Sequence, residues 1–298
     1  MHRPRESPQA PLADALSGFG PGRRFSHAAA GGYSHRMHRA KLTHILAAGL
    51  AMVLASAASC AADPRLDRAE AAVAASLPKA VAADVLARIK AAPERFLSLL
   101  EEADKESKEV PDLLRRVDKT VALPDSYVPT DLASLDGTGL SVARKGLSLR
   151  KEALQALLLM ARAAKADGVT LVASSTYRSY EYQVEVFART AREMGGEAAA
   201  DRVSARPGHS QHQLGMALDF GSIDDSFAET KASRWLTANA RRFGFSLSYP
   251  KGLEPVTGYA WESWHYRYIG KPAAALEGEY FGGVQQYLIL FFQAFLPQ

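Results

Sequence analysis

The sequence predicts an α+β fold: a small antiparallel sheet with helices packed around it, preceded by a helical N-terminal segment. From about residue 115 onward, short runs with strand character lie between longer segments of helical periodicity. Residues 66–106 are instead rich in Ala, Leu, Lys and Glu, with apolar residues at helical spacing. The chain contains no internal repeat and no low-complexity tract. Helices segregated from a small sheet are the pattern of an α+β domain.

The segment 61–114 is predicted to be helical and to serve in packing or in spacing the following domain from a membrane. Its periodicity predicts short helices near 66–77, 82–91 and 94–106. Pro93 interrupts the helical pattern between the second and the third of these helices.

The main domain is predicted to span residues 115–298, beginning with a proline-containing, extended stretch over 117–132 that runs along its surface. Ser148 is the expected N-cap of the first helix, and Gly168 is its expected end. The expected elements are a helix over 149–166, a strand over 169–175, a helix over 179–193, a strand over 215–220, a helix over 226–242, two strands over 245–249 and 263–269, and a short apolar helix over 282–295. We expect this last helix to pack into the core or to dock, with membrane contact as the alternative.

The basic charge of the chain is concentrated at its N-terminus. The 298 residues, enough for one or two domains, carry a formal net charge of +4. Seven of the 36 Lys and Arg residues, but only two of the 32 Asp and Glu residues, lie within residues 1–60, which leaves 29 basic and 30 acidic residues in the remainder. The remainder lacks the basic surplus of a nucleic-acid-binding surface, so we expect no nucleic-acid partner.

Residues 37–60 are predicted to be a signal peptide. A basic start after Met37 is followed by an apolar run from Ile45 to Ala58 and then by small residues. The run is shorter than the ~18 residues expected of a membrane-spanning helix. We therefore expect an exported protein, periplasmic or associated with the cell envelope. Residues 1–36, rich in Pro, Gly and Arg, are expected to be a disordered extension or an untranslated stretch upstream of a true start at Met37.

Cys60, the only cysteine of the chain, has two interpretations. The stretch from Ala57 to Cys60 is similar to a bacterial lipoprotein cleavage box, although Ala57 stands where a Leu is usual. Cleavage there would leave a lipid on Cys60 and attach the protein to a membrane, whereas cleavage nearby would discard the cysteine with the signal. Under either interpretation the mature domain has no disulfide, so its stability must come from its core.

The histidines that follow residue 60 lie in two short segments that also contain acidic residues. The first segment holds His209, His212 and Asp219, and the second holds Glu262 and His265. Two imidazoles and a carboxylate with a fourth position left open form the ligand set of a catalytic zinc, which lowers the pKa of its bound water to about 7. The sequence therefore predicts one Zn²⁺ ion and a hydrolytic reaction.

The spacing of these residues indicates how they could converge. His212 and Asp219 lie on either side of a turn that contains Gly215, and His265 would come from a neighbouring strand as the third ligand. Glu262 would be the base for the attacking water. On a regular strand a residue three positions before His265 would face the other way, so we expect a turn or a bulge between 262 and 265.

Each of these residues also has a structural interpretation when it is taken alone. His265 could be a packed, hydrogen-bonded residue of an aromatic strand, and His209 is expected to be a loop residue or a neighbour of the site. Asp219 could cap a turn, and Glu262 could pair with Arg267. A single metal ion is the preferred interpretation because it explains the placements jointly.

The residues also resemble a known family. The motifs Ser210-x-His212-x-x-Gly215-x-Ala217-x-Asp219 and Glu262-x-Trp264-His265-x-Arg267-Tyr268 are similar to the signature pair of VanY-type D-alanyl-D-alanine carboxypeptidases, zinc enzymes of the bacterial cell wall. Upstream, Tyr177-Arg178-Ser179-x-x-x-Gln183 is similar to a third motif of that family, and the stretch from Lys119 to Pro129 resembles its lead-in. The likeness covers residues 115–270 and implies a hedgehog/D-Ala-D-Ala-peptidase-like fold.

The resemblance implies roles for individual residues: zinc ligands His212, Asp219 and His265, general base Glu262, and peptide contacts Gln183 and Ser210. It implies that Arg178 stabilises the oxyanion or holds a substrate carboxylate. A guanidinium beside a helix N-terminus also suits carboxylate recognition on physical grounds, although Arg178 alone could be a surface residue. Gln211 and Thr176 stand where the family often has Glu and Gly, and we expect them to alter the substrate rim without touching a ligand.

The leading hypothesis is a zinc-dependent D-alanyl-D-alanine carboxypeptidase that trims the C-terminal D-amino acid from peptidoglycan stem peptides, with Glu262 activating the water. L,D-carboxypeptidase and endopeptidase activities on peptidoglycan are alternatives with the same chemistry. A non-catalytic, zinc-containing wall-binding module is an alternative of another class, but it would need neither Glu262 nor Arg178. The motifs leave open the choice between the D,D and L,D reactions, and also the oligomeric state.

Overall fold

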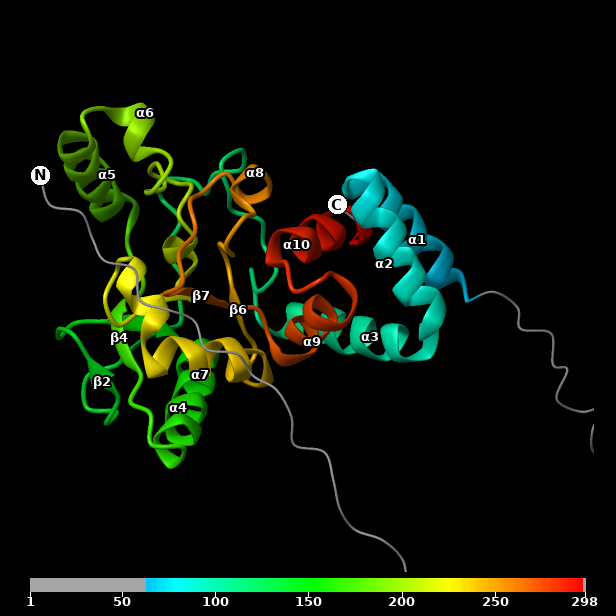
Figure 1. Ribbon diagram of the computed structural model, residues 1–298, viewed down its shortest axis with the longest axis horizontal. Helices are drawn as coiled ribbons and strands as arrows, with labels where there is room; N and C mark the ends of the chain where they lie inside the picture. Colours follow the sequence, from blue (N-terminus) through cyan, green and yellow to red (C-terminus); the bar gives the residue numbers. More distant parts are fainter. Residues whose placement is uncertain (1–62, 297–298) are drawn as a thin grey trace, which may run out of the picture. The chain divides into compact units, whose positions relative to one another are not determined.

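The centre of the fold is a five-stranded sheet with the strand order β2-β4-β5-β7-β6 (Figure 1). It is seen in a computed structural model that describes residues 63–296. The strands are β2 (Ser141–Val142), β4 (Val172–Ser175), β5 (Ala217–Phe220), β6 (Phe245–Leu247) and β7 (His265–Tyr268). Separately, β1 (Leu132–Ser134) and β3 (Ser148–Arg150) form an antiparallel pair. Small sheets among many helices confirm the predicted α+β class.

The N-terminal predictions fall outside this description. The extension 1–36, the predicted signal peptide 37–60 and Cys60 all precede the described residues. Among the residues that are described, no helix combines the length and the apolar character needed to cross a bilayer.

The sheet is antiparallel, as predicted, except at its β2 edge. The pairs β4–β5, β5–β7 and β7–β6 are antiparallel, whereas β2 runs parallel to β4. In the β5–β7 pair, Asp219 lies directly opposite His265. Directly opposed residues of an antiparallel pair project from the same face, so the register brings these two side chains together.

The helices of the main domain differ from the prediction in their ends, in the division of one helix and in short helices that were not expected. They are α4 (Lys151–Ala166), α5 (Tyr180–Met194), α6 (Glu197–Ala200), η1 (Gln211–Leu214), η2 (Asp225–Glu229), α7 (Lys231–Asn239), η3 (Ala240–Phe243) and α8 (Glu254–Thr257). The predicted N-cap Ser148 is wrong, because Ser148 belongs to β3 and α4 starts only at Lys151. Ser179, where the second helix was expected to begin, is the N-cap of α5, since its side chain accepts from the Tyr182 N–H. The single helix expected over 226–242 is divided into η2, α7 and η3, ending before Gly244.

The N-terminal helices pack against the C-terminal ones (Figure 1). The three helices predicted in segment 61–114 are confirmed as α1 (Pro64–Ser76), α2 (Lys79–Ala91) and α3 (Pro93–Glu109). They contact α9 (Lys271–Tyr280), which the sequence analysis missed, and α10 (Gln285–Phe295). Phe96 of α3 packs its ring 5.1 Å from Tyr280 and 6.2 Å from Phe291, measured between centroids. The apolar face of α10 is buried, which confirms the expected packing into the core.

Candidate metal and active site

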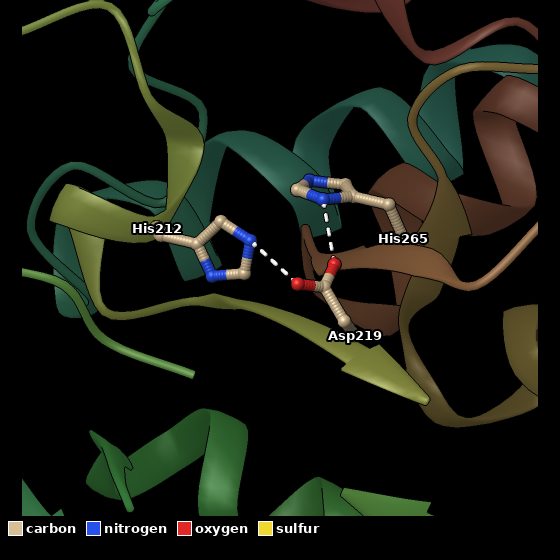
Figure 2. Close-up of side chains that lie close together, drawn as sticks. All are labelled: His212, Asp219 and His265. Carbon is tan, nitrogen blue, oxygen red and sulfur yellow. Dashed lines mark ion pairs between the residues drawn. The ribbon is translucent and has the colours of Figure 1, made fainter. Parts of the chain in front are cut away.

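Three side chains from separate parts of the sequence meet beside the β5–β7 pair (Figure 2). His212 comes from η1, Asp219 from β5 and His265 from β7. Asp219 Oδ2 lies 3.2 Å from His212 Nε2, and Asp219 Oδ1 lies 3.0 Å from His265 Nδ1. One nitrogen or oxygen atom from each residue lies within 4.8 Å of the others, and all three residues are buried. The structure thus brings together the three predicted ligands.

The local sequence explains how His212 comes to face Asp219. Ser210 starts η1 by accepting a hydrogen bond from the His212 N–H with its hydroxyl oxygen at 3.3 Å. Gly215 ends η1 with a φ of 70°, a left-handed conformation that residues with a side chain rarely adopt. The chain therefore reverses at once into β5, and the His212 ring points back towards the carboxylate (Figure 2).

The hydrogen bonds of the two imidazoles direct their free nitrogens into the cluster. His212 Nδ1 lies 2.7 Å from the carbonyl oxygen of Thr176, which can only accept, so Nδ1 carries the proton and Nε2 presents a lone pair. His265 Nε2 lies 3.3 Å from Gln211 Oε1, which leaves Nδ1 facing Asp219. Burial, and then the Arg178 charge, lowers the pKa of His212 to about 4, which favours the neutral imidazole that binds metals.

This donor set fits a metal ion. His212 Nε2 and Asp219 Oδ1 are buried and have no hydrogen-bond partner among the described residues, an arrangement that is costly unless a cation satisfies both atoms. The separations of 3.0 and 3.2 Å are close to the roughly 3.3 Å expected between neighbouring ligand atoms of a tetrahedral zinc site. Two imidazoles and one carboxylate leave the fourth position open, as in catalytic zinc sites.

Glu262 lies beside the cluster because the chain turns immediately before β7. The His265 N–H donates to the Glu262 carbonyl oxygen at 3.3 Å, so β7 begins at His265 and not at the expected residue 263. The irregularity expected between 262 and 265 is therefore a turn ahead of the strand. It places Glu262 Oε2 3.5 Å from His265 Nδ1. Burial, reinforced by the negative charge of Asp219, raises the pKa of Glu262 well above its usual value.

Arg267 and His209, two neighbours of the site, both lie outside the cluster of ligands. Arg267, the alternative partner of Glu262, instead donates to the carbonyl oxygens of Leu113 and Arg115 at 2.9 Å each. His209 was expected to be a loop residue or a neighbour of the site and not a ligand, and this is confirmed: it lies in a loop, with its Nδ1 2.7 Å from the Asp118 carbonyl oxygen, and is not a member of the His/Asp/His cluster.

Arg178 lies in the wall of the site. Its Nη2 is 3.6 Å from Asp219 Oδ2, and its Nη1 donates to Gln183 Oε1 at 2.9 Å. Its Nε is buried and has no hydrogen-bond partner among the described residues. The guanidinium is therefore held in place, while its Nε–H group is not used by any hydrogen bond within the described residues.

Gln183 occupies a different place from the one expected for a peptide contact. It is fully buried, its Nε2 donates to the Ala205 carbonyl oxygen at 2.7 Å, and it is not part of the cavity lining. Because its Oε1 accepts from Arg178, its position suits holding that guanidinium. Ser210, the other predicted peptide contact, does line the cavity.

The expectation that Gln211 and Thr176 touch no ligand is wrong. The Thr176 carbonyl oxygen accepts from His212 Nδ1, and Gln211 Oε1 lies 3.3 Å from His265 Nε2. Both residues are buried, so they contact the histidines and do not form a substrate rim. No sequence pattern indicates either contact, because both depend on which strands and turns lie behind the imidazoles.

The cluster opens into a cavity of about 520 Å³. Its wall includes Arg178, Ser210, Glu262 and two tyrosines that no motif singled out, Tyr249 and Tyr259. The Tyr259 hydroxyl is buried without a hydrogen-bond partner among the described residues. The fold and this site define a class of protein: one in which two imidazoles and a carboxylate could hold a metal ion, with a second carboxylate beside them, at the bottom of a cavity.

Comparison with known proteins identifies the family. Residues 146–271 match the family described as VanY: D-alanyl-D-alanine carboxypeptidase. The putative carboxypeptidase YodJ of Bacillus subtilis (strain 168) is 40% identical over 171 residues, 55% of this chain and 62% of that protein. A D-alanyl-D-alanine carboxypeptidase of Enterococcus faecalis (strain ATCC 700802 / V583) is 38% identical over 120 residues, 38% of this chain and 45% of that protein. The chain thus spans less than two thirds of either relative.

Solved structures agree with this match. The LdcB LD-carboxypeptidase is 37% identical with a TM-score of 0.51, over 56% of this chain and 85% of that one. A mutant of the D,D-pentapeptidase VanY from a VanB-type resistance cassette, in complex with Zn(II), is 31% identical with a TM-score of 0.50, over 59% of this chain and 97% of that one. The chain belongs to the VanY-type D-alanyl-D-alanine carboxypeptidase family, as its motifs predicted.

Proposed function

We propose that the protein is a zinc-dependent carboxypeptidase that removes the C-terminal D-amino acid from peptidoglycan stem peptides. The observation that carries the proposal is the convergence of His212, Asp219 and His265 on one buried point with Glu262 beside it. The relatives named D-alanyl-D-alanine carboxypeptidase and the Zn(II) complex of the VanY D,D-pentapeptidase support the reaction and the metal.

His212, Asp219 and His265 would hold the ion, which when bound polarises a carbonyl group and makes water a stronger acid. Glu262 accepts a proton from the attacking water on its side-chain carboxylate and then donates it to the amine that leaves. A base whose pKa is raised by burial is suited to both steps near neutral pH, because it must gain and lose the proton in one cycle.

Two further groups in the cavity wall would bind the substrate. The positive charge of Arg178 and its free Nε suit the terminal carboxylate of the peptide, which a carboxypeptidase has to recognise, or the oxyanion formed at the scissile carbonyl. The unpartnered Tyr259 hydroxyl suits a peptide carbonyl oxygen as a hydrogen-bond donor. A bound substrate would then accept hydrogen bonds from both Arg178 Nε and the Tyr259 hydroxyl, which have no partner among the described residues.

We propose that this activity takes place outside the cytoplasm, which the N-terminal sequence supports. A signal peptide over 37–60 would export the domain to the periplasm or the cell envelope, where stem peptides are found. Lipid on Cys60 would keep the domain at a membrane surface. Mass spectrometry of the mature N-terminus tests both ideas, since a lipidated Cys60 and a cleaved, unlipidated start differ in mass.

L,D-carboxypeptidase activity on tetrapeptides is a second candidate, favoured by the 37% identity to the LdcB LD-carboxypeptidase. Purified protein loaded with Zn²⁺ is incubated with pentapeptide and tetrapeptide muropeptides, and the products are weighed. Release of D-Ala from the pentapeptide supports the D,D reaction, and release from the tetrapeptide alone supports the L,D reaction. New amino groups in polymeric wall without free D-Ala would indicate an endopeptidase.

Glu262→Gln is the decisive variant for the mechanism. It keeps the size and polarity of the side chain but cannot accept a proton from water, so turnover should fall at least about 10²-fold while Zn²⁺ remains bound. Native turnover with bound metal would refute the assignment of the base. Zn²⁺ binding by a wild-type protein that hydrolyses none of these substrates would favour a wall-binding module.

A further inference from the structure

Helix α10 reaches the metal site through one side chain, Gln285. This residue lies beyond residues 146–271, which match the family, and it is only 1% exposed. Its amide contacts Gln211 at 3.2 Å, and Gln211 in turn lies 3.3 Å from His265 Nε2. A buried chain of hydrogen bonds thus connects the C-terminal helix to a proposed metal ligand.

This chain of hydrogen bonds has a defined direction at its α10 end. The oxygen and nitrogen of a Gln amide can exchange places, so the partners must decide the orientation. The carbonyl oxygen of Ser246, which can only accept, lies 3.4 Å from Gln285 Nε2. Gln285 Oε1 must then point the other way, where it accepts from Gln211 Nε2.

The same direction continues to the imidazole. Because Gln211 donates its Nε2 to Gln285, its Oε1 faces Ser248 and His265. That oxygen accepts from the Ser248 hydroxyl at 2.7 Å and is the acceptor beside His265 Nε2. An acceptor there keeps the imidazole proton on Nε2 and leaves the lone pair on Nδ1, the atom that lies 3.0 Å from Asp219.

We propose that Gln285 is a positioning residue of the metal site, which acts through Gln211 to select the His265 tautomer that binds the ion. The inference rests on the proposed metal site and adds to it a contribution from outside the family domain. A carboxylate at position 211 could accept from His265 with either oxygen and would need no orienting partner. The Gln at this position needs one, and Gln285 supplies it.

The test compares the wild type with Gln285→Leu and with Gln286→Leu as the matched control. Gln286 is the next residue of α10, and its Nε2 donates to Asp118 Oδ2 at 2.8 Å, so its loss removes a hydrogen bond of α10 without touching Gln211. Three quantities are measured: Zn²⁺ affinity by chelator competition, the visible spectrum of the Co²⁺-substituted protein, and the thermal midpoint.

We expect Gln285→Leu to weaken Zn²⁺ binding about 10- to 100-fold and to shift the Co²⁺ bands. Gln286→Leu should lower the thermal midpoint while leaving the affinity and the spectrum as in the wild type. Gln211→Glu introduced into Gln285→Leu should restore most of the affinity, because a carboxylate accepts in either orientation. If Gln285→Leu does not fold, Gln285→Met, which preserves the length of the side chain, takes its place.

The outcomes separate this inference from the proposed function. A wild type that binds no divalent metal would refute the metal site itself. A wild type that binds Zn²⁺ with the same affinity and Co²⁺ spectrum as Gln285→Leu would overturn the role of Gln285 and leave the site intact. Equal losses of affinity in Gln285→Leu and Gln286→Leu, or no rescue by Gln211→Glu, would show that α10 acts only through stability.

Discussion

At the scale of single residues, Tyr259 combines a fixed ring with an unused hydroxyl. Lys119 Nζ lies 3.8 Å from the centroid of its ring, and the Tyr249 ring lies 4.8 Å away. The hydroxyl is buried and has no hydrogen-bond partner among the described residues. A substrate that accepts from this group would form a hydrogen bond that the free protein lacks, so the group should contribute to binding and not to stability.

Tyr259→Phe is therefore expected to lower kcat/KM about 3- to 10-fold, the effect of one neutral hydrogen bond, without lowering the free energy of unfolding. Tyr280→Phe is the control, because its hydroxyl donates to the Ala92 carbonyl oxygen at 2.9 Å. The control should lose about 1 kcal/mol of stability and keep its kcat/KM. Muropeptide kinetics and denaturant unfolding test both. A Tyr259→Phe protein that is less stable but fully active would contradict the assignment.

Asp118 is a buried carboxylate whose hydrogen bonds outweigh the cost of its burial. Burial alone would raise its pKa, but Arg116, Thr120 and Gln286 donate to it and lower the pKa to about 2. A group whose pKa is lower in the folded state than in the unfolded one stabilises the fold above its unfolded pKa. That contribution disappears as pH falls from about 4, the unfolded pKa, through about 2, the folded one.

Asp118→Asn is expected to lower the free energy of unfolding by roughly 2 kcal/mol at neutral pH. This difference from the wild type should shrink as the pH falls from about 4 to about 2. Unfolding free energies of wild type and variant, measured across that range, check the sign. Asp84→Asn is the control, since Asp84 is 58% exposed and its pair with Arg88 should contribute little at any pH. A difference that grows on acidification would show that the carboxylate does not stabilise the fold.

The residues of the proposed metal and active site were more predictable than those packed behind them. His212, Asp219, His265 and Glu262 could be selected because few side chains can bind a metal or move a proton, and their spacing limits how they meet. Gln285 carried no such signal, since its contact depends on how α10 packs against residues 74 positions earlier in the chain. The position of Gln183 was mispredicted because a motif does not show whether a residue faces the cavity or the residue beside it.

At the scale of elements, the turn from η1 into β5 decides whether the cluster can form. Gly215 adopts a φ of 70°, and a Cβ added there would lie 3.0 Å from Arg150 Cγ and 3.0 Å from Leu132 Cδ2. A side chain at this position is thus disfavoured both by the backbone conformation and by the neighbouring pair β1–β3. Since His212 and Asp219 flank the turn, relief of the contact would move one relative to the other.

Gly215→Ala is expected to lose stability and also to weaken Zn²⁺ binding. Gly146→Ala separates the two causes, because Gly146 has a φ of 77° but a Cβ there would meet nothing within 4 Å. The control should show only the backbone strain, about 1–2 kcal/mol, with unchanged metal affinity. Chelator competition and denaturant unfolding give both quantities. Equal effects of the two substitutions on Zn²⁺ affinity would mean that the turn does not set the ligand geometry.

The elements of the main domain were predictable where local signals agreed. Helix α5 has a capping serine, an amphipathic pattern and a terminal glycine, and its bounds differ from the prediction by one residue at each end. The pair β1–β3 and the edge strand β2 were missed, because two- and three-residue strands contain no periodicity. Ser148 does not cap a helix as predicted, because it pairs with Ser134 in the β1–β3 sheet, a contact that local sequence does not indicate.

At the scale of the whole molecule, one apolar core joins the N-terminal helices to the helices that follow the central sheet. Phe96 of α3 is fully buried between Tyr280 of α9 and Phe291 of α10. Arg68 of α1 donates through Nε to the carbonyl oxygen of Phe295 at 3.0 Å. Because α10 also carries Gln285, the same helix is fixed by α1–α3 on one side and contacts the metal site on the other. The N-terminal helices should therefore unfold together with the site.

Phe96→Ala tests this coupling because it removes a large side chain far from the metal ligands in sequence. The cavity that the substitution leaves in the core should lower the free energy of unfolding by about 3–5 kcal/mol. The tryptophans, Trp235, Trp261 and Trp264, all lie in the main domain, so their fluorescence reports that part of the chain while far-UV circular dichroism follows all the helices. If the core is shared, both signals shift together to lower denaturant concentration, as cooperative unfolding requires.

Leu159→Ala is the control: position 159 is 49% exposed, so the substitution should shift neither signal. An early loss of dichroism with an unshifted fluorescence transition would instead show that α1–α3 unfold independently, and α10 would then have to hold Gln285 in place without them.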